Sequence, residues 1–263
     1  MSHRIRSSSL LIILLLITGL AGAQTEKATV KTISKTEQAA IKFLNKNYLL
    51  LAPEKDSSDK HPIVIYLHGA GGRGDDINKS RNQLPPLWQG IHNFKKSPCY
   101  LVAPQVLKKT DGGTYAKWTP KDLNHFLNHL KAAYPIDPNR IYLTGNSMGG
   151  YGTWVWSATN PEHFAAVAPI SGGIGYGGPK EITPDLKAWA KSLTKIPVYA
   201  AVGGKDRVVP PERSELLINE IKKAGGTKAT LKIFPEEGHN ARSKVYASSE
   251  FYEWLFSNSL SDK

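Results

Sequence analysis

The stretch Ile141–Gly152, IYLTGNSMGGYG, passes from an apolar, β-branched segment into four glycines and a single serine. Gly145 and Gly149 flank Ser147 in the pattern G-x-S-x-G, with a predicted strand before it and a predicted helix after it. A strand that turns directly into a helix strains the serine backbone and crowds the neighbouring positions, where glycine avoids a collision. The stretch therefore predicts that the Ser147 hydroxyl projects beside a helix N-terminus, where a nucleophile can act.

On both sides of this stretch, apolar segments of strand length alternate with segments of helix length. Strands are predicted at Tyr48–Pro53, Ile63–Gly69, Tyr100–Gln105, Arg140–Gly145, Phe164–Gly172, Ile196–Gly203 and 229–235. Helices are predicted at Thr119–Tyr134, 149–160, Pro211–Ala224 and Val245–Phe256. In the first of these helices, Thr119 and Asp122 form the pattern of a capping box. This order predicts an α/β fold with a mostly parallel central sheet and helices on both faces.

The catalytic candidates follow predicted strands, because ligands bind beyond the carboxyl ends of the strands in such sheets. A serine nucleophile needs a histidine base and a carboxylate that orients it, and after this type of serine the acid precedes the histidine in the chain. His239 directly follows the last predicted strand, whereas His163 lies at a junction from helix to strand. Asp206 also follows a strand, whereas Asp185 lies in a longer excursion. The predicted catalytic residues are therefore Ser147, Asp206 and His239.

The charge that develops on a substrate oxygen needs two backbone donors. One is predicted to be the N–H of Met148, which follows the nucleophile. The other is predicted to be the N–H of Ala70, in the glycine-rich loop LHGAGGRGDD after an early strand. His68 is expected to brace this loop rather than act as the base. A phosphate-binding reading of the loop fails because neither G-K-[ST] nor a G-x-G-x-x-G fingerprint with its acidic partner is present.

Three residues near the same strand ends are predicted to bind substrate: Gln105, Trp118 and Asn146. Trp118, with Tyr115, could stack on an aromatic or sugar ring, although packing of Trp118 against the fold is an equal alternative.

The N-terminus has the pattern of an export signal, with Arg4 and Arg6, an apolar run from Leu10 to Leu20, and Ala21-Gly22-Ala23 as a cleavage site. The predicted organisation is a signal peptide at residues 1–23, a lead-in at 24–44 and a catalytic domain at 45–263. This organisation predicts a secreted or periplasmic protein with no stable membrane anchor after cleavage.

The 263 residues carry a formal net charge of +12, and the only cysteine is Cys99. The basic residues are spread along the chain and no basic-aromatic nucleic-acid signature is present, so no nucleic-acid partner is expected. A single cysteine, no H-E-x-x-H and no close His/Asp cluster predict that the protein uses neither a metal nor another cofactor.

Six segments together resemble the α/β-hydrolase superfamily: YLHGAGGRGDD, VAPQ, YLTGNSMGGYGTW, AAVAPISGG, VGGKDRVVP and EEGHN. More narrowly, they resemble bacterial secreted serine esterases related to carbohydrate esterase family 1, the branch similar to feruloyl esterases and polyhydroxybutyrate depolymerases. That group overlaps in pattern with peptidases of the prolyl oligopeptidase type. The resemblance covers about residues 45–257 and implies the same triad and the same two oxyanion donors. Asn146 departs from it, since relatives often carry an apolar residue there.

The expected reaction is hydrolysis of a carboxylic ester through an acyl-enzyme, on a small-molecule or polymer-attached ester. Feruloyl and acetyl esters of polysaccharides are the candidate substrates. Two alternatives stay open, a serine peptidase of the prolyl oligopeptidase type and a non-catalytic binding protein with a hydrolase fold.

Overall fold

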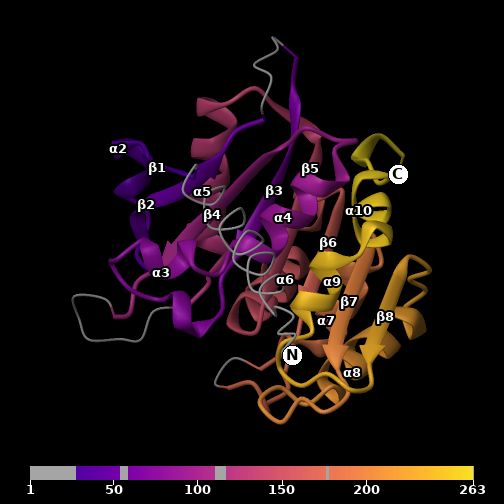
Figure 1. The fold of residues 1–263 in the computed structure, drawn as a ribbon. Coiled ribbons are helices and arrows are strands. Elements are labelled where there is room, and N and C mark those ends of the chain that lie inside the picture. The colour runs from indigo at the N-terminus through magenta and orange to yellow at the C-terminus, as the bar shows by residue number, and fades with distance from the viewer. Residues whose placement is uncertain (1–27, 54–58, 110–116, 176–177, 263) are drawn as a thin grey trace, which may run out of the picture.

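A computed structural model describes residues 28–53, 59–109, 117–175 and 178–262, which fold around one eight-stranded sheet. The strand order is β1-β2-β4-β3-β5-β6-β7-β8 (Figure 1). The strands are β1 (Thr29–Thr32), β2 (Leu44–Leu51), β3 (His61–Leu67), β4 (Tyr100–Val106), β5 (Ile136–Asn146), β6 (Ala166–Ile170), β7 (Val198–Gly203) and β8 (Ala229–Phe234). β1 and β2 pair antiparallel with their neighbours, and all other neighbouring strands pair parallel. The prediction of a mostly parallel central sheet is confirmed.

Helices cover both faces of this sheet. They are α2 (Lys35–Gln38), α3 (Asn78–Arg81), α4 (Pro85–Phe94), α5 (Pro120–Ala133), α6 (Met148–Thr159), α7 (Leu186–Leu193), α8 (Glu212–Lys223), α9 (Arg242–Ala247) and α10 (Ser249–Phe256). Single 3₁₀ turns lie at η1 (Ala70–Gly72), η2 (Pro161–His163) and η3 (Leu260–Asp262). One hydrophobic cluster packs α5, α6, α7 and α8 on one face, and a second packs α4, α9 and α10 on the other. Along β5, Leu143 enters the first cluster and Tyr142 the second, as strand alternation requires.

The start of α5 differs from the predicted capping box. The Thr119 side chain accepts a hydrogen bond from the Asp122 backbone N–H at 3.3 Å, as expected. However, the Asp122 carboxylate is buried and accepts from the backbone N–H groups of Lys42 and Phe43, the latter at 2.6 Å. Asp122 therefore ties the chain segment before β2 to α5 instead of completing the box.

The closing helix predicted at Val245–Phe256 is two helices. The chain is extended at Ser248, between α9 and α10, with φ −87° and ψ 122°. The Ser248 side chain accepts a hydrogen bond from the Phe251 N–H and so begins α10 as an N-cap. The break turns the last helix relative to α9, and both helices contribute to the same hydrophobic cluster.

The N-terminal lead-in contains regular structure in its described part. β1 adds an edge strand to β2, and α2 packs on α5. The predicted signal peptide lies outside the described residues. Within the described ranges, no helix has the length and apolar character needed to cross a membrane.

Candidate active site

Ser147 occupies a strained turn between β5 and α6. Its backbone has φ 59° and ψ −116°, in a region that residues other than glycine rarely adopt. A Cβ added at Gly149 would lie 1.8 Å from the Leu67 carbonyl oxygen, and one at Gly145 would lie 2.4 Å from the Gly149 carbonyl oxygen. Both glycines are therefore required by close backbone approach, as the sequence predicts. The Ser147 N–H donates to the Ile170 carbonyl at 2.9 Å, which joins the turn to the end of β6.

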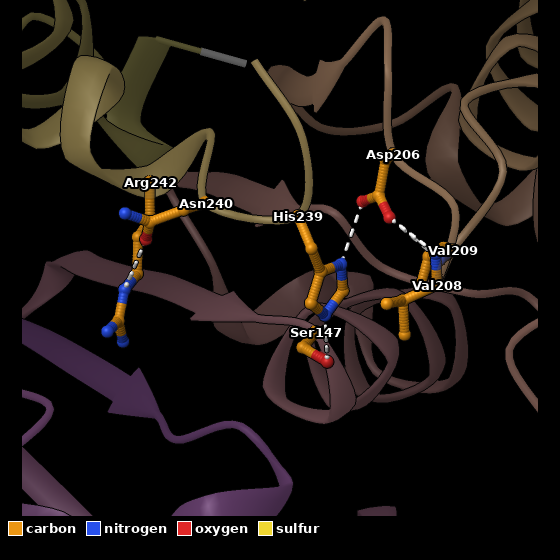
Figure 2. A network of polar contacts seen from close by, with 7 residues as sticks. All are labelled: Ser147, Asp206, Val208, Val209, His239, Asn240 and Arg242. Atoms are coloured by element: carbon orange, nitrogen blue, oxygen red, sulfur yellow. Dashed lines mark hydrogen bonds and ion pairs between the residues drawn. The ribbon is translucent and has the colours of Figure 1, made fainter.

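The three predicted catalytic side chains form one hydrogen-bonded chain (Figure 2). His239 Nε2 lies 2.8 Å from Ser147 Oγ, and His239 Nδ1 lies 2.8 Å from Asp206 Oδ2. The Asp206 side chain is 0% exposed, whereas the His239 side chain is 28% exposed. The carboxylate is thus sheltered from water, while the imidazole side chain is partly exposed to solvent.

Backbone contacts hold the acid and the histidine in place. The second carboxylate oxygen of Asp206, Oδ1, accepts hydrogen bonds from the N–H groups of Val208 and Val209, both at 2.9 Å. This bonding leaves Oδ2 directed at His239 (Figure 2). The loop before His239 lies against the end of β7, since a Cβ added at Gly203 would be 2.1 Å from the Gly238 carbonyl oxygen. Asp206 therefore both caps its own turn and orients the imidazole.

The alternative histidine and acid lie elsewhere. His163 belongs to η2, which precedes β6, so it lies at the amino end of that strand and at the opposite edge of the sheet from Ser147. Asp185 is the residue before α7, and its backbone N–H donates to the Thr183 hydroxyl. Among the described residues, His239 and Asp206 are the histidine and the acid that join Ser147 in one hydrogen-bonded chain.

The predicted oxyanion donors lie on either side of Ser147. Met148 begins α6, and Ala70 begins η1 in the loop of residues 69–76, which we call the β3 loop. A Cβ added at Gly69 would lie 3.5 Å from the Ser147 Cβ, so the β3 loop directly borders the serine. Within the described ranges, neither the Met148 N–H nor the Ala70 N–H donates to a protein acceptor, so both donors are available to a ligand.

His68 braces the β3 loop, as predicted. Its Nδ1–H donates to the Gly69 carbonyl at 2.7 Å, and its Nε2 accepts from the Val106 N–H at 3.0 Å. Both ring nitrogens are satisfied only in the neutral form that carries its proton on Nδ1. Burial lowers the pKa of His68 to about 4, so the ring stays neutral near neutral pH.

Two predicted substrate-binding residues are wrong. Trp118 is 1% exposed, packs against the His68 ring with 4.8 Å between centroids and a tilt of 59°, and donates from Nε1 to the His68 carbonyl. Gln105 is 0% exposed, and its side-chain amide hydrogen-bonds to Asn45 and to the carbonyls of Gly72 and Asp76. Gln105 lies near the carboxyl end of β4, where its side chain bonds to the β3 loop, and Trp118, later in the chain, packs against α6 at Gly152. Tyr115, the proposed stacking partner of Trp118, lies outside the described residues.

Asn146 is buried beside the nucleophile, and its Oδ1 has no hydrogen-bond partner in the described part of the chain. A role in substrate binding stays a prediction for this residue.

Arg242 is a feature of this region that the sequence reasoning missed. It begins α9, three residues after His239, and is drawn with the catalytic side chains in Figure 2. Its guanidinium donates to the Tyr66 hydroxyl and to Asn240 Oδ1, each at 3.3 Å, and among the described residues no carboxylate is ion-paired with it. In the sequence, the feature that could have indicated Arg242 was its position three residues after His239. No group of three or more His, Cys, Asp or Glu side chains in the described ranges could hold a metal ion.

The parallel sheet and the strained serine at its carboxyl edge define an α/β-hydrolase. The sequence model of the dienelactone hydrolase family matches residues 101–249, and the chain belongs to this family.

The names of individual relatives indicate several activities. The chain is 32% identical over 123 residues to "Poly(3-hydroxyalkanoate) depolymerase C" of Paucimonas lemoignei, covering 43% of this chain and 28% of that protein. It is 28% identical over 130 residues to "Probable feruloyl esterase C" of Aspergillus terreus, covering 49% of this chain and 47% of that protein. The solved structure of a thermostable esterase superposes with a TM-score of 0.72 at 27% identity, covering 89% of this chain and 64% of that one. The chain thus spans about half or less of the length of these curated relatives.

Proposed function

We propose that the chain is a serine hydrolase that cleaves carboxylic esters through an acyl-enzyme formed on Ser147. The observation that carries this proposal is the hydrogen-bonded chain from Ser147 through His239 to Asp206, set on a strained turn at the carboxyl edge of the sheet. Each group has the partner that its role in acyl transfer requires.

The reaction follows from the two bonds of His239. Because Nδ1–H donates to Asp206, the lone pair of Nε2 faces the Ser147 hydroxyl and can take its proton as the oxygen attacks the ester carbonyl. The buried carboxylate of Asp206 stabilises the imidazolium that forms. The imidazolium then protonates the departing alcohol, and a water molecule repeats the sequence to release the acid and free serine.

The carbonyl oxygen becomes negatively charged in each step. The N–H groups of Met148 and Ala70 have no acceptor among the described residues and could bind it, and Met148 also begins α6, whose N-terminal end carries partial positive charge. These two groups are the oxyanion hole of the proposed mechanism.

Replacement of the nucleophile tests this proposal. Ser147→Ala is expected to lower kcat for p-nitrophenyl acetate by about 10⁴-fold or more while the protein stays folded. A fluorophosphonate should label the wild type at Ser147 and leave the variant unlabelled, as shown by peptide mass spectrometry. Ser192→Ala, on α7, is the matched control, which should hydrolyse the ester and react with the fluorophosphonate as the wild type does. Ester hydrolysis that survives in Ser147→Ala would reject the proposal.

Feruloyl or acetyl esters attached to polysaccharides are the proposed natural substrates. The names of the depolymerase and feruloyl esterase relatives support polymer-attached esters, and so does the partial exposure of the His239 side chain. An assay panel of short aliphatic, feruloyl and acetylated-sugar esters, run beside acyl-peptide anilides, separates this proposal from a peptidase. Preference for the anilides would favour the peptidase.

An anionic lactone is a second candidate substrate, and Arg242 is the observation that favours it. The guanidinium has no carboxylate partner among the described residues, and the family carries the name of a lactone hydrolase. Arg242→Gln should raise KM for a carboxylated lactone and leave KM for a neutral ester unchanged. An equal effect on both substrates would remove this candidate.

Export is proposed from residues 4–23 alone. Mass determination of the mature N-terminus in the producing cell, expected at Gln24, tests it.

A further inference from the structure

A buried amide side chain that the mechanism does not use holds the β3 loop from the protein interior. Gln105, at the end of β4, donates from Nε2 to the carbonyl oxygens of Gly72 at 2.8 Å and Asp76 at 2.7 Å. These two carbonyls lie on both sides of the bend in the loop. One buried amide therefore uses both of its hydrogens to fix the loop to the sheet.

A second amide completes the arrangement. Asn45, on β2, donates from Nδ2 to Gln105 Oε1 at 2.8 Å and to the Asp75 carbonyl at 3.1 Å. Its own Oδ1 accepts from the Asn47 N–H at 3.0 Å. All four amide hydrogens of the Asn45–Gln105 pair are thus used, and each side-chain oxygen has a donor. A buried polar network that is fully satisfied is rigid and favours one arrangement.

The hydrogen bonds continue from Gln105 to the proposed oxyanion donor. Gly72, held through its carbonyl, donates its N–H to the Gly69 carbonyl at 2.9 Å, and His68 Nδ1 donates to the same oxygen at 2.7 Å. In a trans peptide the carbonyl and the following N–H point in opposite directions. Because the Gly69 carbonyl is held toward His68, the N–H of Ala70 points away from His68, and Gly69 itself lies beside Ser147.

We propose that Gln105, supported by Asn45, is a positioning residue that fixes the direction of the Ala70 N–H in the oxyanion hole. It acts through the β3 loop and touches no substrate. The inference rests on the proposed ester hydrolysis at Ser147. It assigns Gln105 a role in binding the transition state, where a preorganised donor matters most, and no role in binding the ground-state substrate.

Gln105→Met tests this, since methionine has nearly the same length and donates no hydrogen bonds. The variant is expected to lose about 10- to 100-fold in kcat/KM for p-nitrophenyl acetate, because a loosened donor loses much of its effect. KM should change by less than about 3-fold. The inhibition constant of a boronic acid, which forms a tetrahedral adduct on serine, should rise by the same factor as kcat/KM falls. Asn45→Ala should also lower kcat/KM and raise the boronate inhibition constant, but by smaller factors. In the double variant, the loss of transition-state binding free energy should be smaller than the sum of the two single losses.

Asn124→Leu is the matched control, because Asn124 is another amide that joins two elements, half-buried on α5, where it accepts from Trp156 Nε1 and donates to Asn160. It should lower the urea midpoint without changing boronate affinity. If Gln105→Met does not fold, Asn45→Ala carries the test. A folded variant that binds the boronate as tightly as the wild type overturns the inference. A wild type that neither hydrolyses esters nor binds the boronate overturns the proposed function instead.

Discussion

On one side of Ser147 the β3 loop is fixed by buried side chains, whereas on the other side Asp206 and His239 lie in loops joined mainly through the backbone. His68 and Gln105 hold the β3 loop from the interior, and both are fully buried. The loops after β7 and β8 are joined by Gly204 N–H to the Phe234 carbonyl at 2.8 Å and Lys205 N–H to the Glu237 carbonyl at 2.9 Å.

This difference matches what each side has to do in the proposed reaction. A donor for the oxyanion works best when it does not move, and buried, satisfied side chains keep it still. A base has to give its proton to a departing alcohol and take one from water, so it needs access to solvent, and the His239 side chain is 28% exposed. Four substitutions test the two sides separately.

We call the side of Ser147 with Asp206 and His239 the base side, and the side with the β3 loop the donor side. The largest effect is expected on the base side, from His239→Ala. Without the imidazole nothing takes the Ser147 proton, so kcat should fall by about 10⁴-fold or more. The urea midpoint should change little because the loop is held by its backbone. Steady-state assays with p-nitrophenyl acetate measure the loss, and a decrease of under ten-fold would contradict the role given to His239.

On the donor side, His68 should make stability depend on pH. Its pKa is about 4 in the folded protein and near 6.5 in an unfolded chain, so the unfolded state binds more protons between these values. The contribution of His68 to the free energy of unfolding should therefore be fully present above about pH 6.5 and decrease as pH falls toward 4. At pH 4.5 the loss should be about 2 kcal/mol.

His68→Gln removes this titration. Urea unfolding of both proteins at pH 7 and pH 4.5 isolates the contribution of His68, because the other histidines titrate equally in both. An unfolding free-energy difference between the two proteins that does not vary with pH would show that His68 is not held neutral.

Trp118→Phe should have a smaller effect, confined to stability. The variant loses the hydrogen bond from Nε1 to the His68 carbonyl, which predicts a loss of about 1 kcal/mol in the free energy of unfolding. KM should be unchanged for feruloyl and aliphatic esters, since the indole is buried. A large rise in KM for the feruloyl ester alone would restore the stacking role predicted from sequence.

Lys205→Ala should have the smallest effect. Lys205 pairs with Glu236 across the β7 and β8 loops, but both side chains are mostly exposed. Exposed pairs contribute about 0.5 kcal/mol or less, and the backbone bond from Lys205 to Glu237 remains. Activity and urea midpoint should match the wild type, and a clear loss of activity would mean that the base side also depends on side-chain contacts.

The sequence was a good guide to the base side. His239 and Asp206 each follow a strand, and parallel strands bring their carboxyl ends to one edge whatever the loop details. The same rule failed for Gln105, near the carboxyl end of β4, and for Trp118, later in the chain, because both side chains are covered. Position after a strand predicts the edge of the sheet, but it cannot predict whether a loop from another strand lies over the residue.

By itself, the sequence determined the parallel sheet, the elbow at Ser147 and the chain order of serine, acid and histidine. These depend on local spacing, apolar pattern and the need for glycine where backbones meet. Only the tertiary structure decided that Gln105 and Asn45 support the β3 loop, and that Asp122 joins α5 to the segment before β2. Such contacts pair residues far apart in the chain, and a buried amide or carboxylate binds whichever backbone groups the packed fold brings to it.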